Sequence, residues 1–287
     1  MNIYELILDV MDFFVLPQSI VILAGLVMFG NWLLRTSLGK KALSGSVERR
    51  NNMAPFIPFV PFVVYFGLSY PVLWMADLAT ASAEDWQRKL VEHIAGGILI
   101  TATIGLIIFL ARRNFARGLK GFGIDTRTIG RDLGAALINL LTIWPLVLFV
   151  VIMTSFAGKL IYGPDFEIEQ HQELQLLSDF SQMPVLVAVF ITTVILGPVF
   201  EEMVFRGLFQ TLFRSFTAKP WGVIVLSSIL FVIPHSNQQH WPGLFVLSMA
   251  MGYSYEKSGS LFRPILIHAL FNATSVIITF LQVVKQA

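Results

Sequence analysis

The strongest constraint on the fold is a series of apolar stretches with the length of membrane-spanning helices. Such a helix needs about 20 consecutive, mostly apolar residues. Candidate segments occur at residues 17–34, 54–76, 94–111, 134–157, 184–205, 221–235, 241–255 and 264–284. We therefore expect an all-α fold, a polytopic membrane helical bundle of about eight transmembrane helices, and a multi-pass protein of the cell membrane whose surroundings are the lipid bilayer.

The composition agrees with this expectation and excludes several classes of function. Hydrophobic residues make up 55% of the chain and charged residues 13%, whereas soluble domains carry roughly 25% charged residues. The net charge of +2 provides no basic field for nucleic acid, so we expect no nucleic-acid partner. The chain has no cysteine, which excludes disulfides, thiolate metal ligands and a cysteine nucleophile.

The charges of the connecting loops alternate along the chain. Loops 35–53 and 112–133 carry five and six basic residues, whereas loops 77–93 and 158–183 are acidic on balance. The positive-inside rule then puts the first, third, fifth and seventh loops in the cytoplasm and both termini outside. The first 16 residues lack a basic n-region and favour an interfacial amphipathic helix over a signal peptide.

Ionisable side chains inside the later apolar segments point to function. Each costs at least about 2.5–3.5 kcal/mol at mid-bilayer. In the segment 184–205 and just beyond it, Glu202 and Arg206 are four residues apart and can pair on one helix face. Glu201 is rotated by about 100° from that face and has no such partner, which suits a general base. A purely structural Glu–Arg pair remains the alternative for Glu202 and Arg206.

Two further segments carry imidazoles. His235 follows Phe231 by four residues at the end of one segment, and His268 precedes Asn272 by four residues in the last segment. Singly, these are consistent with a helix-end histidine and an interhelical hydrogen-bonding pair. Together with the two glutamates, these side chains are the groups that a hydrolase active site requires. A carboxylate and an imidazole activate water, and an imidazole and an amide stabilise an oxyanion.

These residues resemble the motifs of a known family, the CAAX protease and bacteriocin-processing (CPBP, or ABI) intramembrane proteases. The family motifs EExxxR, FxxxH and HxxxN match Glu201–Arg206, Phe231–His235 and His268–Asn272, in the same order and on successive segments. The resemblance covers roughly residues 184–276. It implies that residues 184–287 form a catalytic four-helix core, and that residues 1–183 supply four more variable transmembrane helices.

The resemblance also implies roles for the site residues. Glu201 and His235 would activate the water, His268 and Asn272 would stabilise the oxyanion, and Glu202 and Arg206 would support the site. It implies no cofactor and no metal, with zinc as the minority alternative, since no HExxH sequence occurs. From helix depth we expect a cavity that opens to the cytoplasm.

The expected function is therefore an intramembrane endopeptidase whose partner is a peptide or lipidated-protein substrate in the membrane. A non-catalytic membrane scaffold or immunity protein is the first alternative, since intact motifs show only that the groups are present. A transporter is the second, and it is disfavoured because transporters tend to have two symmetric halves, whereas here the polar groups lie in the C-terminal half. The identity of the substrate and the oligomeric state do not follow from the sequence.

Overall fold

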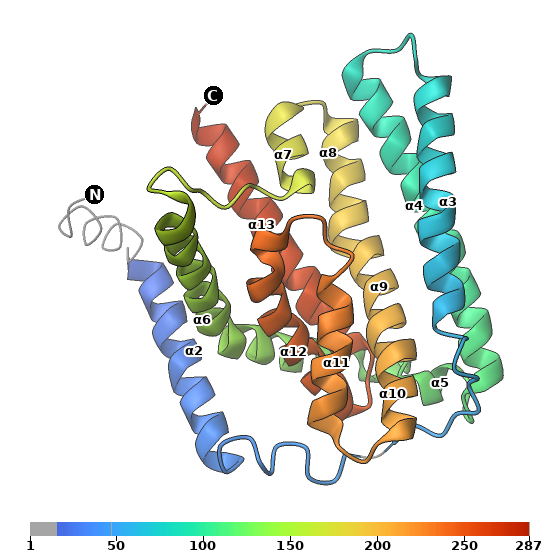
Figure 1. Ribbon diagram of the computed structural model, residues 1–287, viewed down its shortest axis with the longest axis vertical. Helices are drawn as coiled ribbons and strands as arrows, with labels where there is room; N and C mark the ends of the chain where they lie inside the picture. Colours follow the sequence, from blue (N-terminus) through green and yellow to red (C-terminus); the bar gives the residue numbers. More distant parts are fainter. Residues whose placement is uncertain (1–15, 47, 287) are drawn as a thin grey trace.

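The fold is a bundle of long helices (Figure 1). The computed structural model describes residues 16–46 and 48–286. Within these ranges the chain forms helices and no β-strand, apart from one isolated bridge between Asn51 and Phe115. The predicted all-α membrane bundle is confirmed, while the interfacial helix expected over residues 1–16 falls almost wholly outside the described residues.

All eight predicted apolar segments form helices. The six regular ones are α2 (Leu16–Arg35), α3 (Phe59–Ala79), α4 (Asp85–Asn114), α6 (Ile129–Tyr162), α12 (Trp241–Ser258) and α13 (Phe262–Gln286). One continuous helical column consists of α8 (Met183–Phe190), η2 (Ile191–Leu196), α9 (Gly197–Glu202), η3 (Met203–Gln210) and α10 (Thr211–Phe216). The shorter elements are α5 (Leu119–Phe122), η1 (Thr126–Thr128), α7 (Gln172–Asp179), α11 (Pro220–Val232) and η4 (Gln238–His240).

Among the described residues, five helices are long and apolar enough to cross a bilayer, which makes this a multi-pass membrane protein. They cover Phe59–Ala79, Asp85–Asn114, Thr126–Tyr162, Met183–Phe216 and Phe262–Leu281. The expected count of eight spans is not confirmed. Three segments fall short in length or polarity. In α2 the residues Ser19–Arg35 form an apolar helix that is shorter than these spans. The helix α11 has 13 residues and rises only about 20 Å, against a hydrocarbon core of about 30 Å, and α12 is too polar over its 18 residues.

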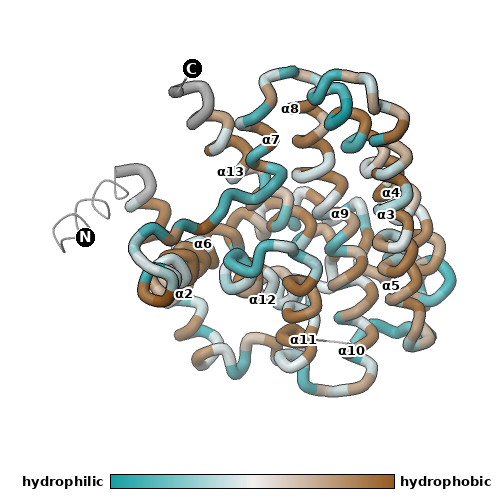
Figure 2. Tube along the Cα trace, turned by 45° about the horizontal axis from the view of Figure 1, so that its top comes forward, coloured by the Kyte–Doolittle hydropathy of each residue, from teal (hydrophilic) through white to brown (hydrophobic). Residues whose placement is uncertain are grey.

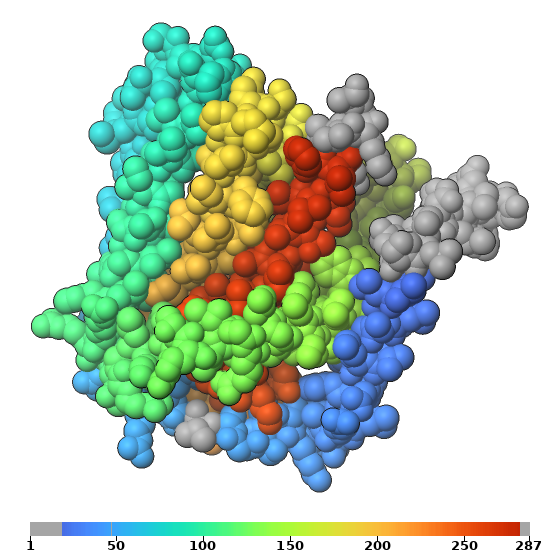
Figure 3. Space-filling model, turned by 180° about the vertical axis from the view of Figure 1, so that it is seen from behind, coloured from blue at the N-terminus to red at the C-terminus, as the bar shows by residue number. Residues whose placement is uncertain are grey.

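The helices surround a short central hairpin. The α3–α4 pair forms one flank and α2 packs on α6 at the other, while α11 and α12 pair with each other between them (Figure 1). From behind, α13 runs obliquely between α6 and the α8–α9 column (Figure 3). Hydrophilic segments gather at the helix ends, including the α3–α4 turn and α7 (Figure 2). The hairpin therefore ends deep inside the bundle instead of crossing it.

The α8–α10 column departs from α-helical geometry on both sides of the two glutamates. Both η2 and η3 are π-helical, with α9 between them. In η2 the Gly197 N–H bonds to the Thr192 carbonyl, and the next residue, Pro198, has no N–H to offer to the Thr193 carbonyl. Such π-helical turns occur frequently at functional sites, and here one leaves a backbone acceptor free for another helix.

Close packing fixes the lower end of the same column. Gly207 lies directly against the ring of Phe122, so that a Cβ atom at this position would collide with the ring. The Tyr255 hydroxyl donates to the Phe122 carbonyl (2.9 Å). The short helix α5 is thereby locked against η3 and α12, which holds the column at a fixed height in the bundle.

Candidate active site

A fully buried ion pair forms the base of the site. Arg206 Nη1 donates to Glu202 Oε1 at 2.7 Å, and both side chains are completely buried, so the pairing predicted from their spacing is confirmed. Arg206 Nη2 also donates to the carbonyl (3.0 Å) and hydroxyl (2.7 Å) of Ser248 on α12. The guanidinium lies over the Phe231 ring, 4.6 Å from its centroid. The pair therefore ties the column to both helices of the central hairpin.

His268 lies between the two glutamates. Its Nδ1 is 3.1 Å from Glu202 Oε1, and its Nε2 is 4.0 Å from Glu201 Oε2. Because Glu202 is paired with Arg206, its carboxylate accepts, and the proton at this contact belongs to His268 Nδ1. This leaves Nε2 as the atom that faces Glu201. The partner that Glu201 lacks within its own helix is thus supplied by α13.

His235 lies just beyond the end of α11, with its ring fixed by the backbone. Its Nδ1 is 2.9 Å from the Phe231 carbonyl. A carbonyl oxygen only accepts, so Nδ1 carries the proton and Nε2 presents a lone pair in the neutral ring. Trp241 Nε1 donates to the His235 carbonyl at 2.9 Å. The Phe231 ring contacts both the His235 ring and the His268 ring, with centroids 5.0 and 5.7 Å apart, so one aromatic side chain spaces the two imidazoles.

Asn272 uses the free carbonyl of the π-helical turn. Its Nδ2 donates to the Thr193 carbonyl at 2.8 Å, the acceptor that Pro198 leaves without a partner in its own helix. A carboxamide nitrogen has two hydrogens, and this bond uses one of them. Asn272 is therefore oriented by η2 and retains a second N–H, which is what an oxyanion donor requires.

Several polar atoms in this cluster are buried without a hydrogen-bond partner among the described residues. They are Glu201 Oε2, Glu202 Oε2, Thr193 Oγ1 and Arg206 Nε. Buried polar side-chain atoms without such a partner are rare in proteins, and all four belong to the helical column from η2 to η3. The Glu201 side chain is 27% exposed, in contrast to the fully buried Glu202. Glu201 is thus the carboxylate that water can reach.

The donor set does not match a metal triad. Over residues 16–46 and 48–286, no three His, Asp or Glu side chains converge as metal ligands would. Glu202 Oε1 is already engaged by Arg206 and His268. The expected absence of a metal or other cofactor stays a prediction.

The structure also identifies supporting residues that the motifs did not include. Ser248 binds Arg206, Thr193 accepts from Asn272, and Trp241 fixes the His235 backbone. A serine in the middle of an apolar helix is a recognisable signal for an interhelical contact. The roles of Thr193 and Trp241 depend on a backbone carbonyl, so side-chain patterns carry no sign of them.

Comparison with known proteins agrees with the motifs. Residues 183–274 match the family model described as type II CAAX prenyl endopeptidase Rce1-like. The chain is 27% identical over 117 residues to an uncharacterized 24.3 kDa protein of Escherichia coli, covering 39% of this chain and 54% of that protein. It is 29% identical over 141 residues to the UPF0177 protein YaiF of Lactococcus lactis, covering 47% and 61%. No solved structure matches the chain.

The chain spans 54% and 61% of the lengths of these two relatives, and their names state no activity. The family match extends over the column α8–α10, the hairpin α11–α12 and the first half of α13. All three motifs lie inside it. The resemblance predicted from the motifs is thus confirmed: residues 183–274 are similar to the Rce1-like type II CAAX prenyl endopeptidases.

Proposed function

We propose that the protein is an intramembrane endopeptidase that hydrolyses peptide bonds of membrane-associated substrates, of the CAAX type or a related one. The observation that carries the proposal is the meeting of Glu201, Glu202 and His268 from two helices, with His268 Nδ1 3.1 Å from Glu202 Oε1 and His268 Nε2 4.0 Å from Glu201 Oε2. A purely structural ion pair would require Glu202 and Arg206 alone. The second, partly exposed carboxylate adds a desolvation cost that a hydrolytic role explains.

In the proposed reaction a water molecule lies between Glu201 Oε2 and the imidazole nitrogens. Glu201 accepts a proton from this water, helped by the lone pair of His235 Nε2, and the oxygen attacks the scissile carbonyl carbon. The tetrahedral oxyanion accepts from the second N–H of Asn272 and from His268 Nε2 in its protonated form. The C–N bond then breaks, and the proton taken from water passes to the leaving amine.

Each supporting contact has a purpose in this scheme. The bond from His268 Nδ1 to Glu202 leaves Nε2 directed toward the reacting atoms. Arg206 donates to the same Glu202 oxygen at 2.7 Å and so holds the carboxylate in position to accept that bond. This arrangement needs no metal. We expect hydrolysis to continue in strong chelators, and stoichiometric zinc whose removal abolishes turnover would contradict that expectation.

The test is a comparison of protein termini in membranes that contain the wild type or the Glu201→Gln variant. A neutral amide does not accept the proton of water, so termini produced by the wild type should be absent from the variant. Glu48→Gln is the matched control, because Glu48 is exposed on the connection between α2 and α3, and it should cleave normally. Equal thermal unfolding of all three proteins excludes misfolding as the cause.

If Glu201→Gln and wild type give the same new termini, Glu201 is not the base, and Glu202→Gln becomes the next variant to test. If neither produces termini, the protein does not act as a protease under these conditions, as expected for a membrane scaffold. Co-purification of the same membrane partner with wild type and Glu201→Gln would support that alternative.

A further inference from the structure

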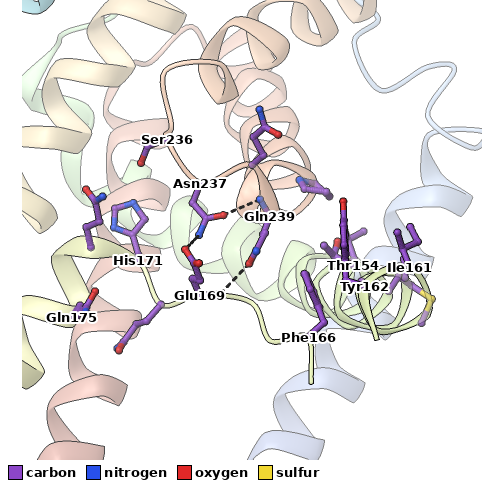
Figure 4. Close-up of a pocket in the computed structure, with 18 residues that line it drawn as sticks. Thr154, Ile161, Tyr162, Phe166, Glu169, His171, Gln175, Ser236, Asn237 and Gln239 are labelled. Atoms are coloured by element: carbon purple, nitrogen blue, oxygen red, sulfur yellow. Dashed lines mark hydrogen bonds between the residues drawn. The ribbon is translucent and has the colours of Figure 1, made fainter. Parts of the chain in front are cut away.

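A large cavity lies next to the candidate active site, and none of the motif residues lines it. Its walls are the second half of α6, residues of the loop before α7 and of α7 itself, and the linker between α11 and α12 together with Pro242 at the start of α12 (Figure 4). Its volume is about 1510 Å³. We name it the vestibule. Small-molecule pockets measure roughly 300–1,000 Å³, so the vestibule has room for a larger ligand such as a polypeptide segment.

Hydrogen bonds through Glu169 hold two of these walls together. The Glu169 N–H donates to Gln239 Oε1 (3.0 Å), and Asn237 Nδ2 donates to Glu169 Oε2 (3.4 Å), as Figure 4 shows. His240 Nε2 lies 2.9 Å from the Glu169 carbonyl. The vestibule is therefore built from a fixed connection between the loop before α7 and the α11–α12 linker.

The vestibule leads to the reacting groups. Ser236, which lines it, directly follows His235. Gln170 lines it as well, and its Nε2 donates to Thr279 Oγ1 on α13 (3.5 Å), the helix that carries His268 and Asn272. The helix α7, which also lines the vestibule, packs against α13. The candidate site thus adjoins the vestibule through the linker and through α13.

The vestibule opens on the acidic end of the bundle. Its lining includes residues of α7. Figure 1 shows α7 and the turn between α3 and α4 at one end of the bundle, and the α2–α3 connection and the α10–α11 turn at the other end. The loop 158–183 beside it carries five acidic residues against one lysine, and the opposite end receives the basic loop 35–53. By the positive-inside rule this end faces away from the cytoplasm.

Depth explains why the site is reached from this end. Since α11 rises only about 20 Å from the basic end, the linker that follows it lies deep in the bundle, with the vestibule above it. The basic end has a hollow of about 260 Å³, lined by Phe213, Phe216 and Leu226 among others, and no motif residue lines it. The vestibule points to an opening on the side opposite to the cytoplasmic one expected from helix depth along the sequence.

The lining has two kinds of surface. Side chains of α6 form an apolar wall that includes Val150, Met153 and Ile161. Across from it, six carboxamides lie on the loop, α7 and the linker: Gln170, Gln172, Gln175, Asn237, Gln238 and Gln239. A carboxamide both donates and accepts, as a peptide group does. The vestibule therefore suits an extended peptide whose backbone meets the amides and whose apolar side chains meet α6.

Resting on the proposed proteolytic function, we propose that the vestibule is the substrate-binding chamber and takes a neutral, apolar peptide segment from the extracytoplasmic side of the membrane. The natural absence of cysteine makes single-cysteine labelling clean. Ala157→Cys introduces a thiol on the α6 wall, where Ala157 lines the vestibule and is exposed. Ala218→Cys is the matched control, because Ala218 is exposed in the turn between α10 and α11 at the basic end.

The probe is a pool of short, apolar peptides with a sulfonated fluorophore and a quencher, which do not cross the bilayer. In intact cells, an impermeant maleimide should label Ala157→Cys and leave Ala218→Cys unlabelled, and the peptide pool should protect Ala157→Cys. In proteoliposomes of known orientation, the pool should be cleaved only when it is added on the side from which the maleimide labels Ala157→Cys. Attaching a bulky polyethylene glycol maleimide to the thiol of Ala157→Cys should lower cleavage at least tenfold relative to the same variant before labelling.

Labelling of Ala157→Cys only from the cytoplasmic side would overturn the proposal, as would cleavage of peptide supplied only there or cleavage unaffected by the bulky label. These results leave the protease itself standing if Glu201→Gln is inactive in the same assay. If no peptide is cleaved from either side, the proposed function fails. Protection of the introduced thiol by the peptides then still supports the vestibule as a peptide-binding site, and absence of protection overturns it.

Discussion

Replacing Arg206 with methionine should destabilise the protein more than any exposed charge change. The side chain is fully buried, pairs with Glu202 at 2.7 Å and makes two further bonds to Ser248. Methionine keeps much of the apolar volume but leaves the Glu202 carboxylate buried without its cation. Breaking a buried pair in this way costs about 3–5 kcal/mol. The ratio of folded to unfolded protein should therefore fall by a factor of more than about 100.

The measurement is reversible unfolding in mixed micelles of a neutral detergent and dodecyl sulfate, followed by tryptophan fluorescence. The control is Arg127→Met, which breaks an arginine–aspartate pair whose arginine side chain is 73% exposed. Its unfolding transition should match that of the wild type, because exposed pairs contribute little. The double variant Glu202→Gln, Arg206→Met should regain part of the loss, since it no longer buries an unpaired charge. A loss below about 1 kcal/mol for Arg206→Met would refute the reasoning.

Two further predictions concern catalysis and pH. Asn272→Ala removes a proposed oxyanion donor and should lower kcat about 100–1000-fold. The control Thr274→Ala loses only a hydrogen bond within its own helix and should cleave normally. Equal rates for both variants would contradict the role of Asn272 as an oxyanion donor. Burial raises the pKa of the Glu173 carboxyl, but the hydrogen bond with His93 and the nearby positive charges lower that pKa by more than burial raises it. The net result is a pKa below the ordinary value of 4.5. The stability that this contact contributes is therefore present above pH 4.5 and is lost as the pH falls through the lowered pKa. In that pH range the Tm of the wild type should fall more than the Tm of Glu173→Gln. Identical profiles of Tm against pH for the two proteins would contradict the prediction.

The helices could be predicted because membrane-spanning segments have a strong compositional signal. Every apolar segment identified in the sequence is helical, including the segment 221–235 that becomes α11. The depth at which each helix ends in the bundle was harder to predict. The sequence of α11 is apolar throughout, and only the packing of the hairpin beside α6 and η3 shows that it stops inside the bundle. A division of the chain near residue 183 into two parts stays a prediction.

The sequence identified the residues of the candidate site, but it predicted fewer of the contacts between them. The Glu202–Arg206 pair follows from helical spacing, because residues four apart share a face. The meeting of His268 with both glutamates is a tertiary contact over more than 60 positions, which local spacing does not determine. The bond from Asn272 to Thr193 depends on a π-helical turn and a proline, and the sequence shows the proline without the turn.

The π-helical turns make the chain unusually sensitive to its length in this region. Each such turn holds one residue more than an α-helix would over the same rise. Deleting a single residue between 191 and 196 would allow a regular α-helix to form there, and backbone hydrogen bonding would suffer little. Everything that follows would then turn by about 100° relative to what precedes it. Either the acidic pair would swing away from the last helix, or the outer half of the column would lose its own packing. Selection on this stretch should therefore act on residue number as strongly as on residue identity.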